Sequence, residues 1–245
     1  MADSLERSRG LERQFLLSVS HDLRTPLTSI RGYAEAIADG AAPDPRGAAA
    51  VILGESRRLE RLVKDLLDLA KLESRGFKLT PVTVDMTEIA EDSVAGFRRE
   101  VEAAGLQIRC TEAPPVLATA DPDRLQQVIA NLIENALRFA STTIEVTVVA
   151  DPAWPRIEVA DDGPGIAPED LPHVFERLYV AAHQPKRKET GSGLGLAIVR
   201  ELVELMNGSV QAEANPTGGA RIVVQLPVAP ARVPGPHRLA ATQQP

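Results

Sequence analysis

The sequence NLIENALRF, residues 131–139, decides the fold, because it combines a core-facing helix stripe with polar residues that the stripe does not need. It ends a helix expected over residues 121–139, whose apolar side chains recur every three or four positions. Asn131 and Asn135 stand one turn apart and share the opposite face with Arg138. Asparagine is a poor helix former, and two amides at this spacing can offer oxygen atoms to magnesium. A solvated helix face explains them equally well when they are taken alone.

Two glycine-containing motifs follow this helix. The sequence DDGPGI, residues 161–166, comes after a predicted strand and places the carboxylate of Asp161 beside backbone that can approach a ligand closely. The sequence GSGLGL, residues 191–196, opens the last predicted helix, where free N–H groups and the helix dipole favour an anion such as phosphate. The first motif is also an ordinary turn sequence. The second does not match the dinucleotide-binding, P-loop or protein-kinase patterns.

The N-terminal region is patterned as a helical hairpin. Residues 5–37 and 51–70 carry apolar side chains at helical spacing, and the helix-breaking sequence AAPDP at 41–45 separates them. Two helices bury little surface alone, and each keeps an apolar stripe. We therefore expect two chains to pair as a homodimer through a four-helix bundle.

The rest of the chain alternates strands with helices, which predicts a second domain of mixed α/β type. The expected strands are residues 78–84, 106–111, 142–149, 156–160, 209–214 and 220–226, and the expected helices are 86–104, 121–139 and 194–206. The expected domains are the hairpin at 1–75, the α/β domain at 76–228 with a lid at about 164–190, and a disordered tail at 229–245.

Composition limits the possible partners and compartments. The net charge of −7 and the pI of about 5.2 argue against nucleic acid as a partner. The single cysteine, Cys110, cannot form an internal disulfide, which indicates a reducing compartment such as the cytoplasm. No run of about 18 apolar residues is present, so we expect no direct membrane contact within this chain, although a longer protein could be membrane-anchored.

Taken in order, these motifs resemble those of a known family. The sequences at 131–139, 161–166 and 191–196 resemble the N, G1 and G2 boxes of the sensor histidine kinases. The resemblance implies their ATP-binding fold, an α/β two-layer sandwich that is shared with gyrase, Hsp90 and MutL. The sequence FERLY at 175–179 resembles the F box, which moves with the ATP lid. Independently, FLLSVSHDLRTPLTSI at 15–30 resembles the H box, which carries the phosphorylated histidine.

The resemblance covers residues 10–227 and implies autophosphorylation of His21 from ATP. Neutral imidazole has a lone pair on one nitrogen, which can attack phosphorus directly. The resemblance gives Asp22 the role of partner to the protonated nitrogen, and gives Thr25 a role in holding the water that dephosphorylates the partner. That partner is the receiver domain of a response regulator, which accepts the phosphate on an aspartate.

The resemblance also implies how ATP and magnesium bind. Asn135 would ligand the metal, Asn131 would lie beside the phosphates, Arg138 would reach a phosphate, and Asp161 would bind the adenine amine. Further nucleotide contacts would come from the glycine motifs, at Gly163, Gly165, Ile166, Gly191, Ser192, Gly193, Leu194, Gly195 and Leu196.

Some residues depart from the family pattern and leave two alternatives open. Leu178 and Val180 replace the second aromatic residue and the arginine of the F box, for which Arg177 or the basic run at 186–188 could substitute. A simple ATPase is one alternative, but hydrolysing relatives have a water-activating glutamate where Asn131 stands. The other is a degenerate kinase that serves only as a dimeric scaffold.

Overall fold

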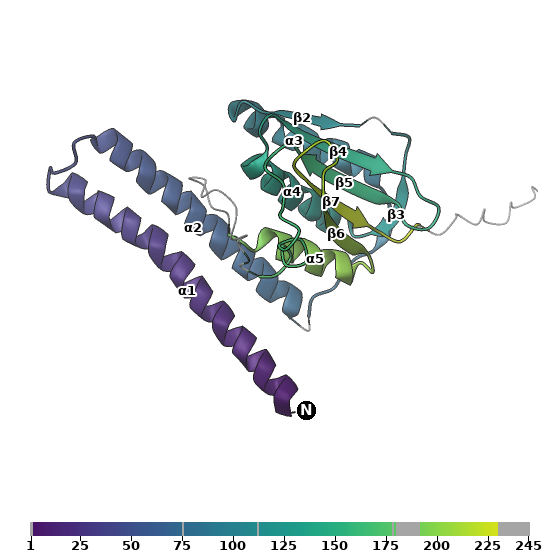
Figure 1. Ribbon diagram of the computed structural model, residues 1–245, viewed down its shortest axis with the longest axis horizontal. Coiled ribbons are helices and arrows are strands. Elements are labelled where there is room, and N and C mark those ends of the chain that lie inside the picture. The colour runs from purple at the N-terminus through teal and green to yellow at the C-terminus, as the bar shows by residue number, and fades with distance from the viewer. Residues whose placement is uncertain (1, 75, 112, 178, 180–191, 230–245) are drawn as a thin grey trace, which may run out of the picture.

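Two long antiparallel helices form a hairpin, and an α/β sandwich packs against it (Figure 1). The structure, a computed structural model, describes residues 2–74, 76–111, 113–177, 179 and 192–229, with side chains from Leu17 onward except at Glu73. Helix α1 spans Ala2–Ala38 and α2 spans Pro45–Glu73, where proline at the first helical position favours helix initiation. The predicted hairpin is confirmed. Among the described residues, no helix has both the length and the hydropathy needed to cross a bilayer.

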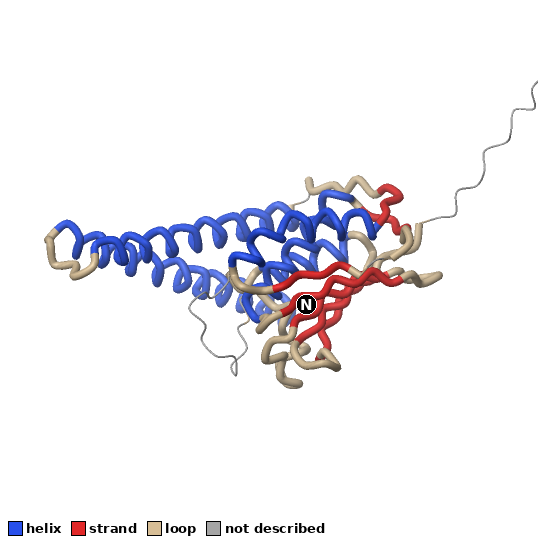
Figure 2. The backbone as a smooth tube through the Cα atoms, turned by 90° about the horizontal axis from the view of Figure 1, so that it is seen from above, coloured by secondary structure: helices blue, strands red, loops and turns tan. Residues whose placement is uncertain are grey.

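The main sheet of the sandwich is mixed and is covered by helices. The strand order is β2 (Gln107–Cys110), β4 (Thr143–Val149), β5 (Arg156–Asp161), β7 (Ala220–Gln225) and β6 (Ser209–Ala214). Strand β2 pairs parallel with β4, and the other pairings in this sheet are antiparallel. The helices are α3 (Met86–Ala103), α4 (Pro122–Phe139) and α5 (Gly195–Leu205). They lie on one side of the sheet, which confirms the predicted two-layer sandwich (Figure 2).

Helix α4 carries the largest share of the helix layer's core. Its buried residues are Leu125, Val128, Ile129, Leu132, Ile133 and Ala136. Each large side chain buried in this way contributes about 1.5–3 kcal/mol relative to an exposed one. Because that stripe faces the sheet, the asparagines of the same helix are left at its half-buried edge, where a ligand can reach them.

The structure corrects the strands predicted near the start of the sandwich. The strand expected at 78–84 is only β1, Val82–Asp85, and it pairs antiparallel with β3, Leu117–Ala120, which the sequence patterns did not reveal. The N–H of Thr80 donates to Asp121 Oδ2 at 2.8 Å, and Pro81 has no N–H, so this segment cannot extend the ladder. Strand β3 was missed because four residues are too few for a period to appear.

Helix α2 packs directly against the sandwich. Leu62, Leu69 and Leu72 are buried in the same hydrophobic cluster as the inner faces of α4 and α5. Next to Leu69, the side chain of Gln127 on α4 donates to the Asp68 carboxylate at 3.0 Å. Helix α2 therefore lies between α1 and the sandwich (Figure 1).

Candidate functional site

His21 projects from the surface of α1. Its side chain is 78% exposed, and its Nδ1 lies 3.4 Å from Asp22 Oδ1. Helix spacing alone does not make neighbouring side chains face each other, so this approach comes from the rotamers. A carboxylate beside Nδ1 favours the tautomer in which that nitrogen carries the proton, which leaves the lone pair on Nε2. The hydroxyl of Thr25 donates to the His21 carbonyl at 3.2 Å.

Asp161 ends β5 as a buried carboxylate. Its Oδ1 accepts from the N–H of Gly163 at 2.8 Å and from that of Ala220 at 3.4 Å. Burial raises the pKa of this carboxyl, against the lowering effect of these two bonds. Neither bond uses Oδ2, and within the described part of the chain that oxygen has no protein donor. It is therefore suited to accept from a ligand amine.

The adjacent carboxylate, Asp162, has a structural role. It accepts from the backbone N–H groups of Ser141, Thr142 and Thr143 at 2.8, 2.9 and 3.0 Å, and also from the Thr142 hydroxyl. Desolvation raises its pKa, but these bonds outweigh it and hold the pKa of Asp162 well below the usual range. Asp162 thus fixes the turn between α4 and β4, while Asp161 faces the candidate site.

Replacing Asp162 with alanine is expected to lower the free energy of unfolding by about 1–2 kcal/mol, because three backbone donors lose their acceptor. Since the folded-state pKa lies below the unfolded value, the stabilisation is present above about pH 4 and is lost as the pH falls through the folded pKa. In urea unfolding from pH 7 to pH 3, the gap in unfolding free energy between the wild type and Asp162→Ala should stay constant above about pH 4. Below that pH the gap should narrow. Glu145→Ala, at an exposed carboxylate on β4, should show no such gap.

Two close backbone approaches hold the Asp161 turn in place. A Cβ on Gly163 would collide with the Phe139 carbonyl at the end of α4. Gly219, with φ of +93°, lies against the Asp161 backbone so closely that no side chain fits. Asn215 Nδ2 donates to the Asp161 carbonyl at 3.1 Å. Sequence reasoning missed Asn215, and it gave Gly219 only a loose resemblance, with Thr217 and Gly218, to the family's last glycine box.

The face of α4 that carries Asn131 and Asn135, here called the asparagine face, contacts the second glycine motif at 191–196. Asn131 Nδ2 lies 3.4 Å from the carbonyl of Gly195, the first residue of α5. Asn135 and Arg138 lie along the same half-buried edge, where Arg138 NH2 is 3.9 Å from the Glu134 carboxylate. Of the other predicted contacts, Gly165 and Ile166 continue the Asp161 turn, Ser192, Gly193, Leu194 and Leu196 lie at the start of α5, and Gly191 lies outside the described residues.

The F-box segment is anchored by its tyrosine. The hydroxyl of Tyr179 donates to the buried Asp170 at 2.5 Å, and this bond raises the pKa of the phenol to about 12. Arg177 is a possible substitute for the missing arginine of the F box. Its NH2 lies 3.3 Å from Oε1 of Glu201 on α5. The departures at Leu178 and Val180 and the basic run at 186–188 lie outside the described residues.

The structure brings the N, G1 and G2 motifs together. The Asp161 turn touches the end of α4, and the second glycine motif touches its asparagine face. The H box lies on α1, and α2 stands between α1 and α5 (Figure 1). The glycine motif contacts α2 itself, where Ser192 Oγ lies 2.5 Å from Asp65 Oδ2, a pairing that sequence reasoning did not identify.

Two family models match the chain. Residues 11–75 match the His Kinase A (phospho-acceptor) domain, and residues 120–230 match the histidine kinase-, DNA gyrase B-, and HSP90-like ATPase. The signal transduction histidine-protein kinase BaeS of Escherichia coli (strain K12) is 33% identical over 93% of this chain and 49% of its own length. Sensor protein SrrB of Staphylococcus aureus (strain MRSA252) is 32% identical over 89% of this chain and 38% of its own length. The chain thus spans half or less of the length of these relatives.

Solved structures agree with the sequence matches. Histidine kinase AdeS of Acinetobacter baumannii is 25% identical, with a TM-score of 0.68 over 86% of this chain and 98% of that one. Full-length ShkA in complex with AMPPNP is 28% identical, with a TM-score of 0.64 over 89% of this chain and 46% of that one. With both family domains present in the same order along one chain, this protein belongs to the sensor histidine kinases of two-component systems.

Proposed function

We propose that this chain binds MgATP in the sandwich, transfers the γ-phosphate to His21, and passes it to an aspartate on a response-regulator receiver domain. One observation carries the proposal: a single chain joins an exposed imidazole, with a carboxylate 3.4 Å from its Nδ1, to an ATPase-type fold. We propose domains at 1–75 and 76–228 for the two halves. We also propose that the chain works in the cytoplasm, where ATP is available.

In the proposed nucleotide site, each end of ATP meets a suitable group. The adenine amine donates to Asp161, and the phosphates lie along the α4 edge beside Asn131 and Arg138. The amide oxygen of Asn135 would hold magnesium, because this cation prefers oxygen ligands, and the metal would neutralise phosphate charge. The similarity to ShkA, solved with the ATP analogue AMPPNP, supports a nucleotide in this fold.

The proposed transfer forms one bond and breaks another. The Nε2 lone pair of His21 attacks the γ-phosphorus, a nitrogen–phosphorus bond forms, and the bond from phosphorus to the β–γ bridging oxygen breaks to release ADP. Asp22 holds the proton on Nδ1 and stabilises the charge that develops on the ring. Because the protein mainly positions groups in phosphoryl transfer, the exposure of His21 matters as much as its basicity.

A labelling assay tests the reaction. Incubated with magnesium and γ-labelled ATP, the chain should acquire label in an acid-labile, alkali-stable bond, and chelation of magnesium by EDTA should stop the transfer. Steady phosphate release without label on the protein would indicate an ATPase instead. Failure to bind MgATP in a calorimetric titration would indicate a scaffold.

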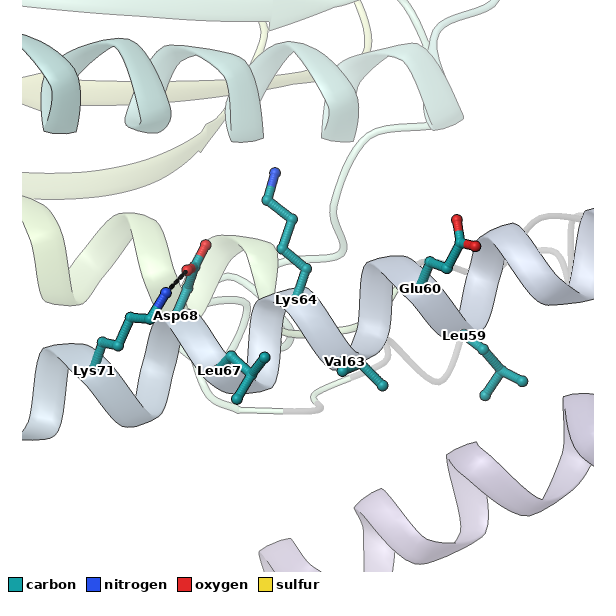
Figure 3. A pocket seen from close by; sticks show the side chains of 7 residues that line it. All are labelled: Leu59, Glu60, Val63, Lys64, Leu67, Asp68 and Lys71. Carbon is teal, nitrogen blue, oxygen red and sulfur yellow. Dashed lines mark ion pairs between the residues drawn. The ribbon is translucent and has the colours of Figure 1, made fainter.

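We further propose a homodimer formed through the hairpin. Leu59, Val63 and Leu67 line one face of α2 and point away from the sandwich (Figure 3). In the single chain Val63 is 46% exposed and Leu67 is 55% exposed, which is unfavourable for side chains of this kind in water. A partner hairpin would bury them in a four-helix bundle.

Replacing both Val63 and Leu67 with glutamate is expected to raise the dimer dissociation constant at least about 100-fold, because the new carboxylates would have to be buried without partners. Sedimentation equilibrium measures the effect. The matched control is Arg57→Glu, at an exposed position on α2, which should leave the dimer intact. A double variant that remains a dimer at wild-type strength would rule out this interface.

A further inference from the structure

A carboxylate of the phospho-acceptor domain reaches into the proposed nucleotide site. Asp65 of α2 accepts from the Ser192 hydroxyl at 2.5 Å, across 127 positions of sequence. The same hydroxyl oxygen accepts from the N–H of Leu194 at 3.2 Å, at the beginning of α5. Asp65 therefore holds, through one serine, the segment whose free N–H groups and helix dipole are suited to an anion.

Arg138 lies near this carboxylate as well. Burial raises the pKa of Asp65, while the hydrogen bond from Ser192 and then the charge of Arg138 lower it. A half-buried carboxylate that receives a hydroxyl proton and lies near a guanidinium has the same kind of environment as a bound phosphate oxygen. The proposed function places Arg138 beside the triphosphate, and the family resemblance makes Ser192 a further nucleotide contact.

The neighbouring contact on α2 has different chemistry. Close to one turn along the helix, Asp68 accepts from Gln127 at 3.0 Å, and neither residue belongs to the proposed nucleotide contacts. Leu69 of α2 is buried in the hydrophobic cluster that also contains the inner faces of α4 and α5. The docking of α2 on the sandwich therefore combines a general packing surface with one contact, at Asp65, that falls on the phosphate-binding groups.

We propose that Asp65 acts as a built-in competitor of the nucleotide phosphates. Its carboxylate accepts from the Ser192 hydroxyl when α2 is docked and is attracted by the charge of Arg138, and the triphosphate must displace it. This inference rests on the proposed ATP site. Two anions that share one set of donors repel each other, so nucleotide binding and docking of α2 are mutually unfavourable.

The competition is tested by nucleotide affinity as a function of phosphate number. Asp65→Asn keeps the shape of the side chain and its acceptor oxygen but removes the charge. It should tighten MgATP binding about tenfold, within the usual range of coupling between sites, and leave the affinity for adenosine unchanged. MgADP should show an intermediate effect. A role that is only structural would shift all three affinities together.

Asp68→Asn is the matched control, because it makes the same change about one turn away at the contact with Gln127. Its MgATP affinity should equal that of the wild type. Equal tightening by both variants, an equal shift for adenosine, or no tightening by Asp65→Asn would overturn the competition. Asp65→Ala, with folding checked by thermal unfolding, gives a second measurement. Wild-type protein that does not bind MgATP would instead refute the proposed function, so the two failures are distinguishable.

Discussion

His21→Gln is expected to abolish transfer of label from γ-labelled ATP to the chain, by more than about 10⁴-fold, because the amide nitrogen of glutamine is not a nucleophile. Glutamine is a good helix former of similar length, and position 21 is 78% exposed, so α1 should be undisturbed. MgATP affinity should also stay at the wild-type value, since Asp161 and α4 are unchanged. The measurement is label per chain at matched nucleotide occupancy.

The control for this variant is His237→Gln, beyond residue 230, where the match to the ATPase family model ends. It should retain full labelling. Label that persists in His21→Gln would show that another residue accepts the phosphate, and the role proposed for Asp22 at 3.4 Å would then lose its basis. Loss of label in both variants would point to a general defect and would also contradict the assignment.

Asp161→Asn is expected to weaken MgATP binding about 100-fold. Oδ1 of Asp161 is committed to the N–H groups of Gly163 and Ala220, so an asparagine would keep its oxygen there. Its NH2 group would then face the adenine amine, and two donors would oppose each other. Calorimetric titration measures the loss, and thermal unfolding checks that the turn remains folded.

The same geometry predicts a change of base preference. Inosine triphosphate carries a carbonyl oxygen where ATP carries the amine, so the NH2 group introduced by Asp161→Asn could donate to it. The ratio of ATP to inosine triphosphate affinities should therefore fall in the variant. Asp162→Asn is the control, since among the described residues that carboxylate accepts from the backbone and hydroxyl groups at 141–143, and the nucleotide affinity of the variant should be unchanged. Wild-type ATP affinity in Asp161→Asn would exclude the adenine role.

Much of the fold could be read from local patterns. The apolar stripe of α4 and the two hairpin helices repeat with the helical period, and neighbouring positions along the chain are sufficient to show it. Strand β3 could not be found in this way, and the expected strand at 78–84 was too long at its start, because Asp121 takes the Thr80 N–H. A hydrogen bond across 41 positions has no signature in the sequence around residue 80.

The candidate site, too, could be predicted from local sequence only in part. The order of the H, N, G1 and G2 motifs identified which residues could carry the chemistry, because each motif is a run of adjacent residues. The motifs assigned the adenine role to Asp161, but they could not show how its environment differs from that of Asp162. The opposite pKa shifts of the two carboxyls come from burial at Asp161 and from the Thr142 hydroxyl and three backbone donors at Asp162. Their partners lie on segments that only folding brings beside the turn.

By itself, the sequence determined the two-domain order, the helical hairpin, the sandwich and the family, because periodicity and short motifs are local properties. The tertiary structure alone decided that Gly219 and Asn215 frame the Asp161 turn and that Asp65 meets Ser192. Such contacts join residues up to 127 positions apart, and they depend on how whole helices and strands pack.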